Sequence, residues 1–448
     1  MAHDIGELAH RLLDAAKTAG ADASDAVVFS SESLSVEVRA GALEHAERSE
    51  NTEAGLRVFL GSKQACVSTS DLREDMIAEL ADRAVAMARV APDDPHAGLA
   101  EPGQLAQDRD ASVLDLADPA TPPGPETLQD IALQAEAAAR AVPGVAQVQD
   151  AGAATWRSAG HLATSTGFSG GSVRTGSSFH AVAIAGEGLE MERDHASEAR
   201  AHFADLPDID TVGHRAGQRA VDRFGAVKPP TGTFPVLYDE RVAGSLIGHL
   251  VSAANGSAVA RGSSWLADAL GTEILPPTLS LREDPTRPRI GGSQVFDAEG
   301  LPARPRDIIR DGVLQGWTLD LATARKLGMD STGNAGRNPS APPYPSVGNL
   351  ALTQGTQSRE DLIRDMGTGL LVTSMIGATI SPTTGDYSRG ASGFWVENGV
   401  ISHPVNECTI AGNLRDMLAR IIPANDARTH LSRVIPSLLV EGMTIAGA

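Results

Sequence analysis

The spacing of apolar residues divides the start of the chain into segments of different secondary structure. The first twenty residues repeat apolar side chains at the three-to-four-residue interval of a helix with one buried face. Residues 25–70 then alternate short β-branched runs with Gly, Ser and Asn, which is typical of an antiparallel meander. A second helical stripe follows over residues 71–90, with Asp71 as the expected N-cap. Residues 1–92 are therefore predicted to form an N-terminal α/β two-layer unit.

A second unit with the same order of elements follows a linker. Residues 93–124 are rich in Pro, Asp and Gly, which predicts a linker. Residues 125–228 begin with an Ala-rich helical segment, continue through strand-like runs and end in a helix near residues 211–224. The order helix, strands, helix resembles that of the first unit, so an internal duplication is possible, although no residue-level repeat is visible.

The remaining residues, 229–448, are Gly-rich and contain many short strand-like runs. Helical patterns interrupt them near residues 241–255, 319–327, 358–366 and 409–422. This spacing favours a β-rich domain over a parallel doubly wound sheet. The predicted fold class is α+β, with two N-terminal helix-plus-antiparallel-sheet units followed by a β-rich C-terminal domain that has a few helices.

Charge and cysteine content restrict the possible partners and the compartment. The chain has 37 basic and 57 acidic residues, a net charge of −20, which repels phosphate backbones and anionic lipid headgroups. We therefore expect neither nucleic acid nor a membrane as a partner. No run reaches the roughly 18 apolar residues of a membrane span, and the first residues are acidic rather than basic as in a signal peptide. The two cysteines, Cys66 and Cys408, are too few for a disulfide framework, so we expect a cytoplasmic protein.

One helical stretch, GSLIGHLVSAANG over residues 244–256, contains a single histidine and no acidic residue. On a helical wheel His249 lies at the border between a broad apolar face and a face of Gly, Ser and Asn. That position suits a half-buried structural histidine, which is the favoured interpretation, while a catalytic base stays possible.

Histidine spacing offers little support for a metal site. Such sites usually need two ligands close together on one rigid element, for example two His one helical turn apart. None of the twelve histidines forms such a pair, and His195 and His202 are seven residues apart. A site assembled from residues distant in the sequence stays open.

Residues 167–171, GFSGG, match the G-x-S-x-G pattern of a serine nucleophile. That pattern requires a helix after the serine, whereas the following residues continue as a strand. A hairpin turn is therefore the favoured interpretation. The alternative is a stand-alone serine hydrolase that uses Ser169 with a distant histidine such as His180 or His195.

Residues 384–399, TGDYSRGASGFWVENG, combine aromatic, basic and Gly residues. The Asn-Gly pair at its end is a hairpin signal. Tyr387 and Trp395 offer flat surfaces, and Arg389 carries a planar fork suited to a carboxylate. Two interpretations have equal support: a tight β-turn system with a surface ion pair, and an edge that binds a partner or a peptide.

Four blocks together resemble the TldE branch, also called PmbA, of the TldD/PmbA family. They are FPVLYDERVAGSLIGHLVSAANGSAVARGSSWL, GDYSRGASGFWVENG, ECTIAGNLRDM and VEGMTIAGA, and the similarity covers nearly the whole chain. In the TldD branch the helix that GSLIGHLVSAANG resembles carries an HExxxH zinc motif. By that comparison Gly248 stands at the first His, His249 replaces the Glu, and Ala253 stands at the second His.

The resemblance implies a chain with no catalytic or metal-binding residues of its own. Glycine and alanine cannot bind zinc, and a histidine in place of the glutamate leaves no carboxylate as general base. The implied role is the subunit that joins a TldD-like chain in a heterodimeric zinc metallopeptidase acting on extended or unfolded peptides, with zinc in the partner. The residues expected to contact peptide or partner are Tyr387, Arg389, Trp395 and His249. A peptide-binding homodimer without activity stays possible.

Overall fold

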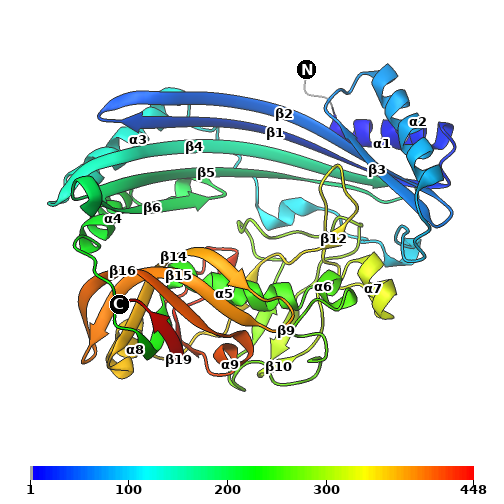
Figure 1. Cartoon of the computed structure of the whole chain (residues 1–448). Coiled ribbons are helices and arrows are strands. Elements are labelled where there is room, and N and C mark those ends of the chain that lie inside the picture. The colour runs from blue at the N-terminus through cyan, green and yellow to red at the C-terminus, as the bar shows by residue number, and fades with distance from the viewer. Residues whose placement is uncertain (1–3) are drawn as a thin grey trace.

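Figure 1 shows the computed structural model, which describes residues 4–448. A long, curved antiparallel sheet lies over the third domain, and helices pack near both ends of that sheet. The fold class is α+β, as predicted, with two helix-plus-sheet units before a β-rich C-terminal region.

The two N-terminal units repeat one order of elements. The first unit contains α1 (Ile5–Thr18), β1 (Ala23–Arg39), β2 (Ala42–Leu60), β3 (Lys63–Thr69) and α2 (Glu74–Val90). The central unit contains α3 (Pro125–Arg140), β4 (Val145–Thr164), β5 (Ser169–Ala185), β6 (Glu192–Arg200) and α4 (Ile209–Asp222). The strand order is β3-β2-β1-β4-β5-β6, and β1 pairs antiparallel with β4. The two units therefore share one continuous sheet.

The shared sheet has two unlike faces. The four helices lie on one of them, here called the helix face: α1 and α2 pack around Val28, and α3 and α4 pack around Val36. Both valines are even-numbered residues of β1 and so point to the same side. The opposite side, here called the inner face, is turned toward the third domain, where Val27 and Leu162 pack against Leu301.

The segment between the two units is held in place by side chains. It contains two short 3₁₀ turns, Pro102–Gln104 and Ala111–Leu114, and Leu105 and Leu114 are buried. Arg325 of the third domain also donates hydrogen bonds to carbonyl groups of residues 96–99. The Pro- and Gly-rich composition thus accompanies a packed connection rather than a free one.

A buried ion cluster joins the inner face to the third domain. Asp25 of β1 accepts a hydrogen bond from Arg57 Nε of β2 at 2.8 Å and another from Arg337 of the third domain. Burial raises the pKa of Asp25, but the charges of Arg337 and Arg57 outweigh burial and leave this pKa below its ordinary value. Asp25 is therefore an ionised carboxylate between two guanidinium groups.

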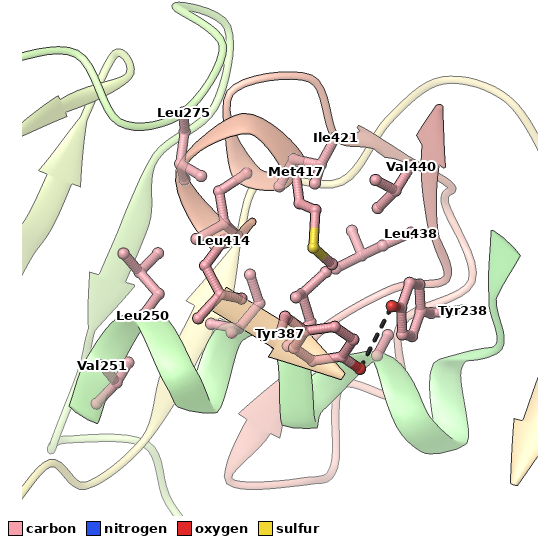
Figure 2. Packing of buried hydrophobic residues seen from close by; sticks show 14 of the residues in the cluster. Tyr238, Leu250, Val251, Leu275, Tyr387, Leu414, Met417, Ile421, Leu438 and Val440 are labelled. Carbon is pink, nitrogen blue, oxygen red and sulfur yellow. Dashed lines mark hydrogen bonds between the residues drawn. The ribbon is translucent and has the colours of Figure 1, made fainter. Parts of the chain in front are cut away.

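The third domain is built on a closed ring of strands. The ring consists of β7 (Gly232–Tyr238), β14 (Gly369–Ile380), β15 (Asp386–Glu397), β16 (Val400–Asn413) and β19 (Leu438–Ala446), and pairing of β16 with β19 closes it. Helix α5 (Glu240–Ala253) buries Leu246, Ile247 and Leu250 in the same core. Figure 2 shows this core, with Leu250 and the hydrogen bond that the hydroxyl of Tyr238 donates to the hydroxyl of Tyr387.

Shorter elements complete the third domain. The strands are β8 (Leu281–Glu283), β9 (Arg306–Arg310), β10 (Val313–Leu314), β11 (Ala335–Gly336), β12 (Tyr344–Pro345), β13 (Leu350–Leu352), β17 (Ile422–Pro423) and β18 (Arg433–Val434). The helices are α6 (Gly256–Ala260), α7 (Leu321–Leu327), α8 (Arg359–Met366) and α9 (Leu414–Leu418). A second sheet has the order β10-β9-β8-β13-β18.

Most predicted elements of the third domain are confirmed, and one is wrong. The helices expected near residues 241–255, 319–327 and 358–366 are α5, α7 and α8. The helix expected over residues 409–422 is instead the end of β16 followed by the short α9. Residues 409–411 pair with β15 on one side and β19 on the other, and this pairing satisfies the backbone as a strand.

The predicted turns are confirmed, and the N-cap residue predicted for one helix is wrong. The GFSGG segment is the β4–β5 hairpin, and Asn398 and Gly399 turn between β15 and β16, both with positive φ. Helix α2, however, begins at Glu74 with Arg73 at the N-cap. The carboxylate of Asp71 accepts a hydrogen bond from Arg73 Nη2 at 2.6 Å, so it is engaged by a side chain outside the helix.

Candidate functional site

Helix α5 holds the three positions that correspond to the zinc motif of the TldD branch. The helix begins after Asp239, whose carboxylate caps it by accepting from the backbone N–H of Arg241 at 3.2 Å. Gly248 borders open space, because a Cβ placed on it meets no atom within 4 Å. Ala253 is buried in the core, and its carbonyl accepts a hydrogen bond from Ser264 Oγ at 2.5 Å.

His249 is half-buried at the border of the apolar face, where the helical wheel places it. Its ring meets Tyr387 edge to face, with ring centroids 5.8 Å apart and an interplanar angle of 73°. Burial and then the charge of Arg389 lower the pKa of His249 below its ordinary value. Its buried Nε2 has no hydrogen-bond partner among residues 4–448. The imidazole is therefore neutral at neutral pH and has one unsatisfied nitrogen.

The donor atoms at these positions do not fit a metal ion. Gly248 and Ala253 carry no donor, which leaves one imidazole nitrogen from His249. In the part of the chain that the structure describes, no group of three His, Cys, Asp or Glu side chains lies close enough to hold a metal. A catalytic zinc needs about three protein ligands and an open position, whereas the three motif positions of this helix supply at most one ligand.

Two of the residues expected to contact a peptide or partner are buried in the core. Tyr387 is 2% exposed and Trp395 is 3% exposed, and Trp395 packs edge to face against Phe234 at a centroid distance of 5.0 Å. The closed ring and α5 surround both side chains, so neither offers an open surface. Arg389 is half-buried, and its Nε donates to the carbonyl of Gly377 at 2.8 Å. Of the four expected contact residues, Arg389 and His249 stay partly accessible.

Ser169 has histidine partners other than those expected. Its Oγ lies 2.9 Å from His161 Nε2 and 3.0 Å from His10 Nε2. His180 and His195 each lie beside an aspartate elsewhere in the sheet. His10 comes from α1, 159 residues earlier, so no local pattern in the sequence could reveal this contact.

A pair of buried carboxyl groups also escaped sequence reasoning. Burial raises the pKa of Asp297 to about 6, although three backbone N–H groups oppose this shift. Burial, followed by the charge of Asp297, raises the pKa of Glu299 to about 8. The surrounding DAEG segment has the composition of an exposed turn, so the sequence holds no signal that these side chains are buried.

Comparison with known proteins gives the family. The models of the PmbA/TldA metallopeptidase match over domain 1 (residues 24–88), the central domain (118–224) and the C-terminal domain (231–447). The metalloprotease PmbA of Escherichia coli O157:H7 is 36% identical over 95% of this chain and 92% of its own length. The chain therefore belongs to the PmbA/TldD family, and the TldE/PmbA branch fits it.

Solved structures share this fold. A putative modulator of DNA gyrase from Bacteroides thetaiotaomicron is 26% identical, with a TM-score of 0.90 over 99% of this chain and 98% of that one. TldE from Thermococcus kodakarensis is 20% identical, with a TM-score of 0.84 over 98% of this chain and 100% of that one, which is a likeness of fold alone. Within the described residues, none of the helices has the length and apolar character needed to cross a bilayer.

Proposed function

We propose that this chain is the non-catalytic TldE-type subunit of a heterodimeric peptidase whose catalytic chain is TldD-like. The complex would process or degrade extended or unfolded peptides in the cytoplasm. One observation carries the proposal: at the three motif positions of α5, only His249 has a side chain able to bind a metal. Membership of the family supports it, since the E. coli relative is named a metalloprotease.

In this role the chain forms part of the wall of the peptide-binding site and adds charge to it, while it supplies no catalytic group. Arg389 offers a cation to a peptide or partner group, and the half-buried, neutral ring of His249 lies beside it with its Nε2 buried. Tyr387 and Trp395 support this wall from inside the core. The TldD-like chain would supply the metal, the water and the base.

The first experiment compares the chain alone with the mixed complex. We expect no stoichiometric zinc in the purified chain, and cleavage of an unfolded peptide only after a TldD-like chain is added. Native mass measurement with and without that chain separates a heterodimer from a peptide-binding homodimer. Chelator-sensitive cleavage by the isolated chain would overturn the proposal.

A second experiment tests the accessible site residue. Arg389→Ala is expected to lower peptide cleavage by the mixed complex, because it removes the cation beside His249. Arg364→Ala is the matched control, since Arg364 is exposed and pairs with Asp361 on the surface of α8. Equal rates for Arg389→Ala and the control would remove Arg389 from the contact surface.

Hydrolysis at Ser169 is the second candidate function, favoured by the 2.9 Å contact with His161. Burial, followed by the charge of His10, lowers the pKa of His161, so this imidazole is neutral and able to accept a proton. Labelling by a fluorophosphonate probe, absent in Ser169→Ala, is the expected result if this function exists. No labelling of the native chain would exclude it.

A further inference from the structure

The middle of the inner face is a surface of small side chains that α1 to α4 leave open, because these helices pack on the opposite face, and the 3₁₀ turn Ala111–Leu114 borders it on the β5 side. Opposite residues of β1, β4 and β5 place serine and glycine next to one another on this face: Ser31, Ser33, Ser158, Gly160, Ser172 and Gly176. Small neutral side chains leave the sheet flat enough for an extended chain to lie along it. Two large aromatic residues interrupt this flat surface.

Phe29 and Trp156 each lie against a glycine of the neighbouring strand. Phe29 pairs with Gly160, and Trp156 pairs with Gly176. A Cβ on Gly160 would lie 3.1 Å from the ring of Phe29, and a Cβ on Gly176 would lie 2.3 Å from the indole of Trp156. The rings therefore cover the two glycines, and they remain 40% and 43% exposed. Both rings therefore present apolar area on the face that is turned toward the third domain.

The two rings have the spacing of an extended peptide. Gly160, under the ring of Phe29, lies four residues after Trp156 on β4. Four residues of a strand span about 13 Å, and an extended peptide places side chains i and i+4 on the same side at the same separation. Phe29 also lines a cavity of about 310 Å³ between the inner face and third-domain residues 294–298 and 335–337. That cavity has room for one large side chain.

Charge on this face favours a cationic occupant. Strand β2 adds Glu47 and Glu53 to the inner face, with Glu53 directly opposite Phe29. The basic residue between the two rings, Arg174, already donates to the carbonyl groups of Gly291 and Ser293 at 2.5 and 2.7 Å. With a net charge of −20, the chain as a whole attracts cations.

We propose that the inner face between Phe29 and Trp156 binds an extended, cationic peptide through two large apolar side chains four positions apart. One side chain enters the cavity beside Phe29, and the other stacks on the indole of Trp156. The inference rests on the proposed function, in which the complex acts on unfolded peptides, and it adds the class of peptide and the residues that hold it.

Tryptophan emission gives a direct readout in the intact chain. Trp265, Trp317 and Trp395 are only 3–4% exposed, so Trp156 is the tryptophan that a peptide can reach among the described residues. The probe is a lysine- and glycine-based peptide with two phenylalanines four positions apart. We expect a blue shift of emission and protection from acrylamide quenching. Trp156→Phe keeps an aromatic ring, so it is expected to keep binding while losing the emission change.

Affinity is measured separately, by anisotropy of the same peptide carrying a dye. Trp156→Ala and Phe29→Ala are each expected to weaken binding about tenfold, which corresponds to about 1.4 kcal/mol. The control peptide has the same composition with the phenylalanines three positions apart, which places them on opposite sides of an extended chain. Its affinity for the native chain is expected to be about as low as that of the first peptide for the alanine variants. Equal affinity for the two peptides, or unchanged affinity in both alanine variants, would overturn the inference.

The outcome is separable from that of the proposed function. If the mixed complex cleaves peptides but the two phenylalanine spacings bind equally, the binding surface is wrong and the subunit role stands. If spacing-dependent binding occurs but no TldD-like chain gains activity, the subunit role is wrong and the surface stands.

Discussion

Gly248 is a helix residue that has neither packing nor a backbone reason to be glycine. It lies inside α5, its Cβ direction is open, and its φ is not among the positive values of the chain. Glycine in a helix interior costs about 0.5–1 kcal/mol relative to alanine because it loses more backbone freedom on folding. Nothing in the packing offsets that cost.

Replacing this glycine therefore gives a prediction at the scale of one residue. Gly248→Ala is expected to raise the free energy of unfolding by about 0.5–1 kcal/mol, measured by urea denaturation. Gly393→Ala is the contrasting control, because its Cβ would lie 1.9 Å from the carbonyl oxygen of Leu371 and must destabilise the ring. A lower urea midpoint for Gly248→Ala would show that an unrecognised contact uses this position.

Individual residues also show which side-chain positions can be predicted from the sequence. The position of His249 at the border of the apolar face follows from local periodicity, because the spacing of apolar residues fixes which side of the helix is buried. The burial of Tyr387 and Trp395 does not, since β19 and α5, which enclose them, are distant in the sequence. The contact of Ser169 with His10 and His161 depends on the same kind of long-range packing.

Among elements, those with a turn signal or one buried face were predictable. The Asn398-Gly399 hairpin and helices α5, α7 and α8 are examples. The full length of β2 was not, because its first ten residues are exposed on both faces and have no alternating pattern. Those residues are a strand only because β1 pairs with them along its whole length. Pairing, rather than local preference, decides such a segment.

The Asp25 cluster gives a prediction at the scale of elements, because it links two strands to the third domain. Asp25→Asn leaves the buried guanidinium groups of Arg57 and Arg337 without a carboxylate. We expect a loss of about 3–5 kcal/mol in the free energy of unfolding, as for other buried pairs that lose one partner. Glu44→Gln is the control, since its pair with Arg39 is exposed, and its cost is expected below about 1 kcal/mol. Similar urea midpoints for the two variants would contradict this account.

Glu299, a carboxyl group buried where the third domain meets the inner face, contributes to the pH dependence of the whole molecule. Burial, followed by the charge of Asp297, raises the pKa of Glu299 from its ordinary 4.5 to about 8, so the folded protein keeps a proton that the unfolded chain releases. Its contribution is therefore fully present below pH 4.5 and is lost as pH rises to about 8. Across that window the free energy of unfolding should fall by up to about 1.4 kcal/mol per pH unit.

Glu299→Gln tests this pH dependence. Glutamine cannot ionise, so the variant is expected to lose the decline in stability between about pH 6 and 8, above the raised pKa of Asp297, measured by urea denaturation across that range. Glu44→Gln, on the exposed part of β2, should keep the decline of the native chain. Parallel pH curves for the native chain and Glu299→Gln would show that Glu299 is ionised in the folded state.

The whole-molecule arrangement is the part that sequence reasoning describes least well. The repeated order of helix, strands and helix was visible, but the pairing of β1 with β4 was not. Residues 25 and 164 are strand partners although a linker and helices separate them in the sequence. Hydropathy does not show which strand of the first unit pairs with which strand of the central unit. The inner face, and the aromatic pair on it, exist only because of this pairing.

The closed ring of the third domain also bears on how the protein is made. Tyr238 of β7 pairs with Leu438 of β19, a strand synthesised two hundred residues later. While the ribosome adds those residues, β7 and the apolar side of α5 have no complete core to enter, and contacts this distant form slowly. A nascent chain of this kind is a natural client for chaperones, and slowing translation after α5 should lengthen its exposure to them.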